Sequence, residues 1–181
     1  MTIEFSEISY MLSNDELCAL ISMSGAKAEN KYSFPLNFSD TISVERGLRS
    51  LEERGRLIRE GENVYVDKVL LFLGHCITKS TRGVAINSST MQCLGVFLAN
   101  SATLCTCDDG VQWMLTPFQK YADAVEYMNP RFTKKKVMYD GELIILKNMH
   151  EIARIPLAGM YSKKVLTVIT NWLSEGNLPS N

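Results

Sequence analysis

Three apolar runs in the middle of the chain are joined by links that allow only one kind of strand pairing. Residues 91–99, 102–107 and 111–118 are strand-like, and the links between them read "NS" and "DDG". Links this short can turn a chain back into an adjacent antiparallel strand, whereas a parallel crossover needs about a dozen residues or more. The middle of the sequence therefore predicts an antiparallel meander, with Pro117 ending its third strand.

The N-terminal part of the chain carries helix signals after a short predicted strand over residues 3–10. Ser13 and Glu16 have the spacing of a capping box, in which each side chain bonds a free backbone N–H at the start of a helix. Gly25 supplies the left-handed stop of this helix. The proline-bearing residues 26–42 that follow show no regular pattern.

Residues 43–67 are the most organised stretch, and they predict a helix, a sharp stop and a hairpin. Ser43 caps the helix and Gly55 ends it, and the buried stripe of the helix consists of Val44, Leu48 and Leu51. The next residues alternate as a small hairpin that turns at 60–63. Asp67 then caps a third helix over 68–77, which is apolar nearly all round and is expected to be buried.

Helix and strand signals alternate after the meander. A helical repeat over 119–128 stops at the Asn-Pro pair that follows it, and the Asp-Gly pair at 140–141 predicts a two-residue hairpin. Residues 151–159 predict one more strand. Ser162 caps a final amphipathic helix, and Gly176 ends it.

The order of these elements predicts an α+β fold. A mainly antiparallel sheet, made of a meander plus a hairpin, is expected to carry packed helices, and the N-terminal part is helix-rich. The chain of 181 residues has the length of one ordinary domain over 1–181. The same pattern allows a division into a helix-rich lobe 1–80 and a sheet-rich lobe 81–181.

Charge and composition favour a cytoplasmic protein without a membrane segment. The formal net charge is −1, so no overall field draws the chain to nucleic acid or to an anionic membrane. The N-terminus lacks the basic and apolar regions of a signal peptide. The five cysteines are odd in number and irregular in spacing, which is untypical of a disulfide framework and suits a reducing compartment.

The residues that usually carry catalysis or bind metals show no productive spacing. Cys105 and Cys107 lie two apart on a predicted strand and share one face, where buried thiols of a core are expected rather than paired zinc ligands. His75 and His150 are the two histidines, and nothing in the sequence marks a neighbouring cysteine as activated. The glycines form no phosphate-binding loop. The sequence therefore predicts no metal, no cofactor and no enzymatic activity.

Residues 43–67 also resemble the recognition helix and wing of small winged-helix regulators. This resemblance implies a DNA-binding transcriptional regulator as the alternative function. Two features count against it: residues 30–42 lack the helical stripe of a scaffold helix, and the exposed face of the helix mixes three acids with two arginines. Weak retention on heparin is expected for an adaptor and clear retention for a DNA reader.

A second resemblance covers residues 10–80. "LSNDELCALISMSG", "FPLNFSD", "LRSLEERGRL" and "VYVDKVLLFLGHCI" follow one another in the order of the EspG family, the cytosolic chaperones of type VII secretion in actinobacteria. The later meander and the amphipathic C-terminal helix are similar to the α+β arrangement of that family. The resemblance implies a chaperone for a helical secreted partner. It rests on pattern and order without a diagnostic motif, so no individual site residue is carried over.

Three residues are the candidates for partner binding. In a meander strand Trp113 points to one face and Met114 to the other. Met114 is expected on an open sheet face, and Trp172 is expected on a ridge of the C-terminal helix. Trp113 is expected to be structural, although aromatic residues are also common interface anchors.

Overall fold

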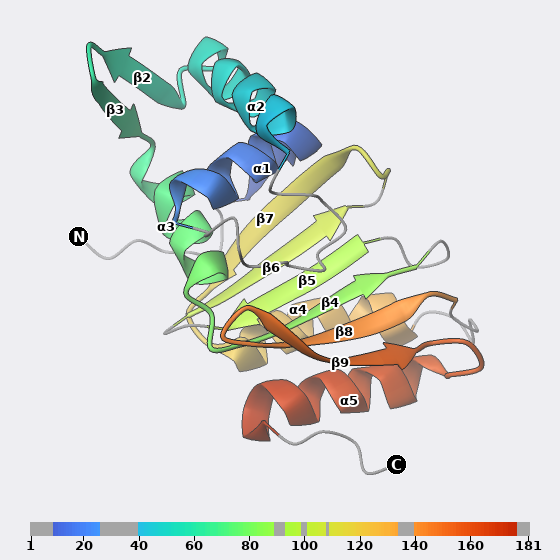
Figure 1. Cartoon of the computed structure of the whole chain (residues 1–181). Helices are drawn as coiled ribbons and strands as arrows, with labels where there is room; N and C mark the ends of the chain where they lie inside the picture. The colour runs from blue at the N-terminus through green and yellow to red at the C-terminus, as the bar shows by residue number, and fades with distance from the viewer. Residues whose placement is uncertain are drawn as a thin grey trace.

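The computed structural model describes residues 9–25, 40–88, 93–98, 101–107, 109–133 and 140–176. In these residues one antiparallel sheet of seven strands has the order β1-β7-β6-β5-β4-β8-β9, and β2 and β3 form a separate two-stranded sheet (Figure 1). The strands are β1 (Tyr10–Ser13), β2 (Leu57–Glu60), β3 (Asn63–Val66), β4 (Arg82–Asn87), β5 (Cys93–Leu98), β6 (Ala102–Cys107), β7 (Gln112–Phe118), β8 (Glu142–Lys147) and β9 (His150–Pro156). The helices are α1 (Asn14–Met23), α2 (Thr41–Glu53), α3 (Lys68–Thr78), α4 (Tyr121–Thr133) and α5 (Ser162–Glu175). The predicted α+β fold is confirmed.

The predicted meander forms, and it is longer than the sequence pattern indicated. β5, β6 and β7 pair in sequence order, and β4, which the sequence analysis did not identify, precedes them as a fourth strand. Pro117 lies inside β7 instead of ending it. Pro117 lies opposite Thr103 of β6, and β7 continues through the proline to Phe118.

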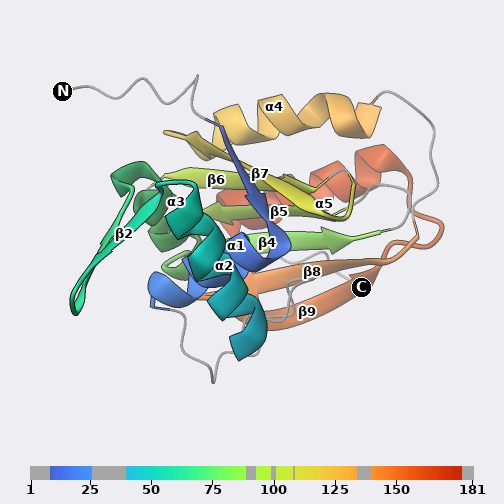
Figure 2. The same ribbon diagram turned by 90° about the horizontal axis from the view of Figure 1, so that it is seen from above.

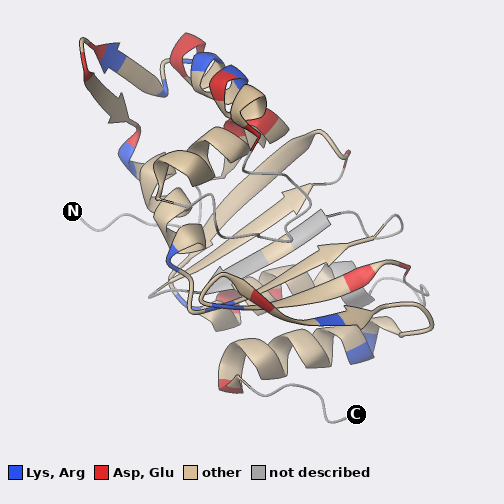
Figure 3. Ribbon diagram, in the orientation of Figure 1, with Lys and Arg blue, Asp and Glu red and all other residues tan. Residues whose placement is uncertain are grey.

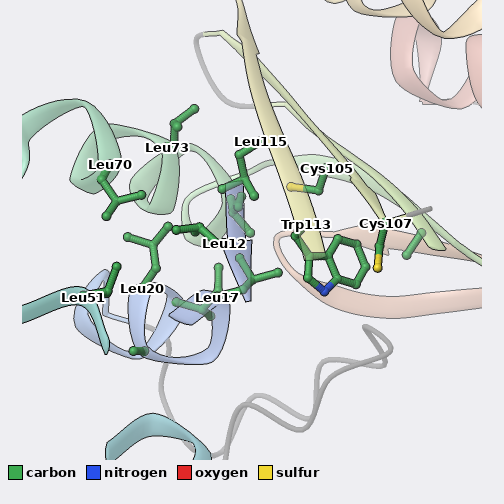
Figure 4. Packing of buried hydrophobic residues seen from close by; sticks show 14 of the residues in the cluster. Leu12, Leu17, Leu20, Leu51, Leu70, Leu73, Cys105, Cys107, Trp113 and Leu115 are labelled. Carbon is green, nitrogen blue, oxygen red and sulfur yellow. The ribbon is translucent and has the colours of Figure 1, made fainter. Parts of the chain in front are cut away.

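Helices cover both faces of the large sheet (Figure 2). α1 and α3 pack on the face to which Cys105, Cys107 and Trp113 point, and leucines from α1, α2 and α3 complete this cluster (Figure 4). α4 and α5 pack on the opposite face against Leu104, Ile145 and their neighbours. The N-terminal helices and the sheet therefore share one core, and the two cysteines lie on the same buried face as predicted.

The strand pairing of β8 differs from the predicted hairpin at Asp140-Gly141. β8 pairs with β9 along one edge and with β4 along the other, so both of its edges are occupied. The hairpin that β8 does form turns at Asn148 and Met149. Residues 136–139, the other arm of the predicted hairpin, and residues 3–8 of the predicted first strand lie outside the described residues.

Three predicted helix ends are wrong, and each error has a local cause. Asp40, not Ser43, caps α2, because the Asp40 carboxylate accepts hydrogen bonds from both the Ile42 N–H and the Ser43 hydroxyl. α4 continues through Pro130, and its buried Ala124 and Met128 hold it on the sheet. Ser162 is the first residue of α5, whose capping position is occupied by Tyr161. The capping box of α1, the αL glycine that ends α5 and the Asp67 cap of α3 are confirmed.

Candidate functional site

The β2–β3 hairpin stands away from the seven-stranded sheet (Figure 1). Leu57 pairs with Val66 and Arg59 with Val64, which places these four side chains on one face of the ribbon, while the pair Ile58 and Tyr65 lies on the other face. Val64, Tyr65 and Ile58 expose 54%, 54% and 53% of their surface. An isolated two-stranded hairpin is marginally stable in water, so these apolar side chains on both faces are a feature to explain.

The base of this hairpin is fixed by a cluster of polar contacts. The Arg56 guanidinium lies 3.0 Å from the Asp67 carboxylate and 5.3 Å from the centre of the Tyr10 ring. The Tyr10 hydroxyl donates to Asp67 at 3.3 Å, and Asp67 also accepts from the N–H groups of Val69 and Leu70 at the start of α3. Burial raises the pKa of Asp67, but these hydrogen bonds and Arg56 outweigh it and hold the pKa below its ordinary value. Strand β1, the hairpin and α3 are thereby joined at one point.

An apolar groove lies between the hairpin and three helices. Its volume is about 400 Å³, and it is lined by Met23 of α1, Leu48 of α2, Leu71 of α3, and Leu57, Arg59, Val64 and Val66 of the hairpin. We call it the hairpin groove. Leu57 in its lining is fully buried in the core, whereas Val64 is exposed to solvent. Arg59 is the one charged residue in this lining.

The packing of α2 on α1 sets the far wall of the groove. Gly47 lies where the helices cross, and any side chain there would collide with the backbone carbonyl of Asp15. Close by, the buried carboxylate of Glu16 lies 2.6 Å from Arg54 and accepts from the Ser50 hydroxyl at 2.8 Å and from the Ser13 N–H at 2.8 Å. Burial alone would raise the pKa of Glu16. The hydrogen bonds from these donors lower it by more, so the pKa of Glu16 lies below the ordinary value of a glutamate.

The charged residues of α2 and the hairpin are only partly paired. Four arginines of α2 and the hairpin are bonded to carboxylates: Arg46 to Asp15, Arg54 to Glu16, Arg56 to Asp67 and Arg59 to Glu52. Glu53 at the end of α2, and Glu60 and Glu62 at the hairpin turn, are exposed and take part in none of the ion pairs found among the described residues. The tip of the hairpin and the end of α2 are red in Figure 3. The hairpin tip and the end of α2 therefore carry exposed acids, of which Glu60 lies on the Ile58 and Tyr65 face of the ribbon, away from the groove.

The same ion pairs bear on the winged-helix interpretation. A helix followed by a hairpin is present at Thr41–Val66, as the sequence predicted. However, a DNA reader needs cations that are free to meet phosphate, and Arg46 is bonded to Asp15 at 2.9 Å. Arg49 is the other arginine on the outer face of this helix, beside the exposed acids Glu45 and Glu53. This surface does not favour a polyanion.

Two of the three predicted binding residues are core residues. Trp172 is 3% exposed and its indole N–H donates to the Gly83 carbonyl at 3.0 Å, so the expected ridge of α5 at Trp172 is wrong. Trp113 is 1% exposed and its N–H donates to Asn14 at 2.8 Å. Met114 is half-buried on the opposite face of β7, beside Met11 of β1, and stays a candidate. The hairpin groove was missed because its walls come from segments far apart in the sequence.

Reactive groups near these cores are held in unreactive states. Burial raises the pKa of the Cys105 thiol, and burial with Asp15 and Asp40 raises that of Cys18 to about 11, so both thiols stay protonated near neutral pH.

Within the described residues, no three His, Cys, Asp or Glu side chains gather closely enough to hold a metal ion. In the same parts of the chain, none of the helices has the length and apolar character needed to cross a bilayer.

Comparison with known proteins assigns no function to this groove. No protein-family model matches the chain, and no curated protein matches its sequence. The functional argument therefore rests on the geometry and charge of the hairpin groove and on the resemblance that the N-terminal sequence pattern carries.

Proposed function

We propose that this chain is a non-enzymatic protein-binding adaptor that holds a segment of its partner in the hairpin groove. The observation that supports the proposal most is the combination of a fixed base and an exposed apolar wall. Leu57 and the Asp67 cluster anchor the hairpin, while Val64 on the groove face, and Ile58 and Tyr65 on the opposite face, remain in contact with water. A partner segment in the groove that covers Val64 would remove apolar surface from water at about 25 cal/mol per Å².

The charge around the groove favours a protein over the other macromolecules that bind exposed apolar or extended surfaces. Anionic membranes and nucleic acids would meet the uncompensated carboxylates Glu53, Glu60 and Glu62. A protein segment can present both an apolar face and cations of its own. Met23, which lines the groove, is also a residue type that protein interfaces use as an anchor.

The finer form of the proposal is a cytoplasmic chaperone for a helical protein that is exported by a type VII-like secretion system. It is supported by the resemblance to the EspG family, which covers residues 10–80. These residues include α1, α2, the hairpin and α3, the elements that line the groove. A secretion ATPase and small helical secreted proteins encoded beside this gene would support the assignment, and a neighbourhood devoted to transcriptional or metabolic genes would count against it.

Site-specific photocrosslinking in the native host tests the adaptor function. A photoreactive phenylalanine analogue at position 64 should give an adduct of one discrete mass, identified by mass spectrometry. The matched control is position 152 on β9, because Ile152 is also a largely exposed apolar residue, at 44%. Adducts of the same protein from both positions, or none from position 64, would contradict docking at the groove.

The DNA-binding alternative has its own test. At low salt the protein should pass through a heparin column, because the arginines of α2 and the hairpin are largely neutralised by Asp15, Glu16, Glu52 and Asp67. Retention that falls steeply with salt and is lost in the double variant Arg46→Glu with Arg49→Glu would favour the regulator instead.

A further inference from the structure

Two of the five cysteines occupy opposed positions on neighbouring strands. β5 and β6 pair antiparallel from Cys93 opposite Cys107 to Leu98 opposite Ala102, so the two cysteines lie at the end of this hairpin that is farther from its turn. Their spacing along the sequence does not reveal the pair, because only the strand register brings positions 93 and 107 together. The fold therefore makes one cysteine pair out of an irregular set.

The separation that this register imposes is suitable for a disulfide bond. Opposed residues of an antiparallel pair have Cα atoms about 4.5 or 5.5 Å apart, depending on whether the two residues exchange backbone hydrogen bonds. Disulfides usually join residues whose Cα atoms are about 4.4 to 6.8 Å apart. Both kinds of opposed pair fall within this range, so the bond can form without a change in strand pairing.

The neighbouring cysteine of β6 has no such partner. Cys105 lies opposite Gly95 of β5 and Leu115 of β7. Cys107 is a free thiol in this structure, 1% exposed, and burial raises its pKa, so it reacts slowly with an oxidant from the solvent. The opposed position on β5 is reached from within the sheet, which makes it the favoured partner of this thiol.

We infer that Cys93 and Cys107 form a reversible disulfide between β5 and β6 when the thiol–disulfide balance around the protein becomes oxidising. The bond acts at a strand end where Cys107 lies opposite Trp113, whose indole N–H donates to Asn14 at the start of α1. Oxidation therefore fixes the sheet where it meets this helix. The inference is independent of the hairpin groove and of the adaptor function.

The oxidant is a low-molecular-weight disulfide such as oxidised glutathione. One of the two cysteines, as its thiolate, attacks a sulfur of the oxidant, which forms a mixed disulfide and releases one glutathione. The other cysteine, as its thiolate, then attacks the protein sulfur of the mixed disulfide and expels the second glutathione. The protein loses two electrons and two protons, and the cleaved disulfide of the oxidant takes up both.

Equilibration of the folded, full chain with mixtures of reduced and oxidised glutathione tests the inference. As the oxidised share rises, the free thiols counted after acid quenching and denaturation should fall from five to three, since the bond consumes two. The intact mass should fall by that of two hydrogen atoms, and reduced glutathione in excess should restore all five thiols.

Peptide mapping identifies the linked residues. Trypsin leaves residues 83–120 as one peptide that contains three of the cysteines, whereas chymotrypsin cuts at the aromatic and leucine residues between positions 93 and 105. The oxidised chain should give a chymotryptic fragment with Cys93 joined to one with Cys107. The variants Cys93→Ala and Cys107→Ala should lose no pair of thiols, and the matched control Cys105→Ala should still lose two.

The wild-type map decides the question even if a variant does not fold. Glutathione adducts without an internal bond, a bond between Cys105 and Cys107, or a Cys93–Cys107 bond that appears only in urea would overturn the inference. A loss of two thiols in Cys107→Ala as large as that in Cys105→Ala would overturn it as well. A Cys93–Cys107 bond in the folded wild type that follows the glutathione ratio in both directions would support it.

Discussion

Two antiparallel hairpins of this molecule differ in what surrounds them. The β8–β9 hairpin joins β4 in the seven-stranded sheet, and all four central residues of β8 are buried, with Ile144 and Leu146 facing one core and Leu143 and Ile145 the other. Among the described residues the β2–β3 hairpin has no third strand, and of its apolar residues only Leu57 is fully buried. Apolar side chains on both faces of a strand therefore indicate a sheet interior in one case and exposed surface in the other.

The free edges of the two hairpins differ as well. In the β8–β9 hairpin the register shifts between Ile145 and Leu146, and Pro156 ends β9. Arg154 of β9 also forms ion pairs with Glu142 at 2.6 Å and with Glu151 at 2.9 Å. Bulges, charges and prolines of this kind protect an edge from pairing with other chains. The described residues of β2 and β3 include neither a proline nor a register shift. The molecule therefore protects the two hairpins by different means: a register shift, ion pairs and a proline on the β8–β9 side, and strands of only four residues with Arg59 and Glu60 in β2 on the other.

The largest expected effect on stability is at Trp172 of α5, the helix that packs on the sheet face opposite to α1 and α3. Trp172→Ala should lower the free energy of unfolding by roughly 3 to 5 kcal/mol, because it empties a core position and leaves the Gly83 carbonyl without its donor. Urea unfolding followed by circular dichroism measures it. A folded variant with unchanged stability would mean that Trp172 is a surface residue. The contrast between a buried β8–β9 hairpin and an exposed β2–β3 hairpin would then be in doubt.

The second prediction compares the two hairpins directly. Ile145→Ala in β8 should destabilise the protein by roughly 2 to 5 kcal/mol, since Ile145 is fully buried. Val64→Ala in β3 should change stability by about 0.5 kcal/mol or less, because its side chain is already in water. The same urea experiment applies to both variants, and similar losses would show that the β2–β3 hairpin is part of the core.

These contrasts show which features the sequence could predict. The meander could be predicted from the two short links at 100–101 and 108–110, and the capping box of α1 from the spacing of Ser13 and Glu16. Both predictions depend only on residues that are close together in the sequence. β4 was missed because its apolar residues Val84 and Ile86 lie in a stretch with few strand signals, and pairing with β5 and β8 supplies what its pattern lacks.

The candidate site was less accessible to sequence reasoning. The hairpin at 57–66 was predicted, but the groove depends on the approach of α1 and α3, which no local pattern encodes. Trp172 was assigned to a surface because the broad apolar face of α5 does not reveal which part of it meets the sheet. The available signal was the alternation around the hairpin turn, where both sets of alternating positions contain apolar residues: Leu57, Val64 and Val66 in one set, and Ile58 and Tyr65 in the other.

The third prediction compares two ion pairs of equal length. Glu16–Arg54 and Glu142–Arg154 both measure 2.6 Å, but the side chain of Glu16 is 2% exposed and that of Glu142 is 43% exposed. Glu16→Gln should cost roughly 2 to 3 kcal/mol, since it removes the charge from a buried network, and Glu142→Gln about 1 kcal/mol or less. Equal effects in thermal or urea unfolding would mean that burial of Glu16 does not determine how α2 is held.

The smallest expected effect is a dependence on pH. The folded pKa of Glu16 lies below its ordinary value, so its contribution to stability is fully present above about pH 4.5 and is lost as the pH falls through the folded pKa. Unfolding midpoints should therefore drop more steeply with acid in the wild type than in Glu16→Gln. A parallel pH profile for the two proteins would exclude Glu16 as an acid-sensitive contact between α1 and α2.

Hydrogen exchange of the backbone amides in β2 and β3 tests the central claim most directly. In the free protein these amides should exchange much faster than those of β8, because two strands alone are marginally stable. Saturation with the partner identified by crosslinking at position 64 should slow exchange in β2 and β3 by about tenfold or more and leave β8 unchanged. Amides of β2 and β3 that are as protected as those of β8 in the free protein, or that do not respond to the saturating partner, would contradict a docking site at this hairpin.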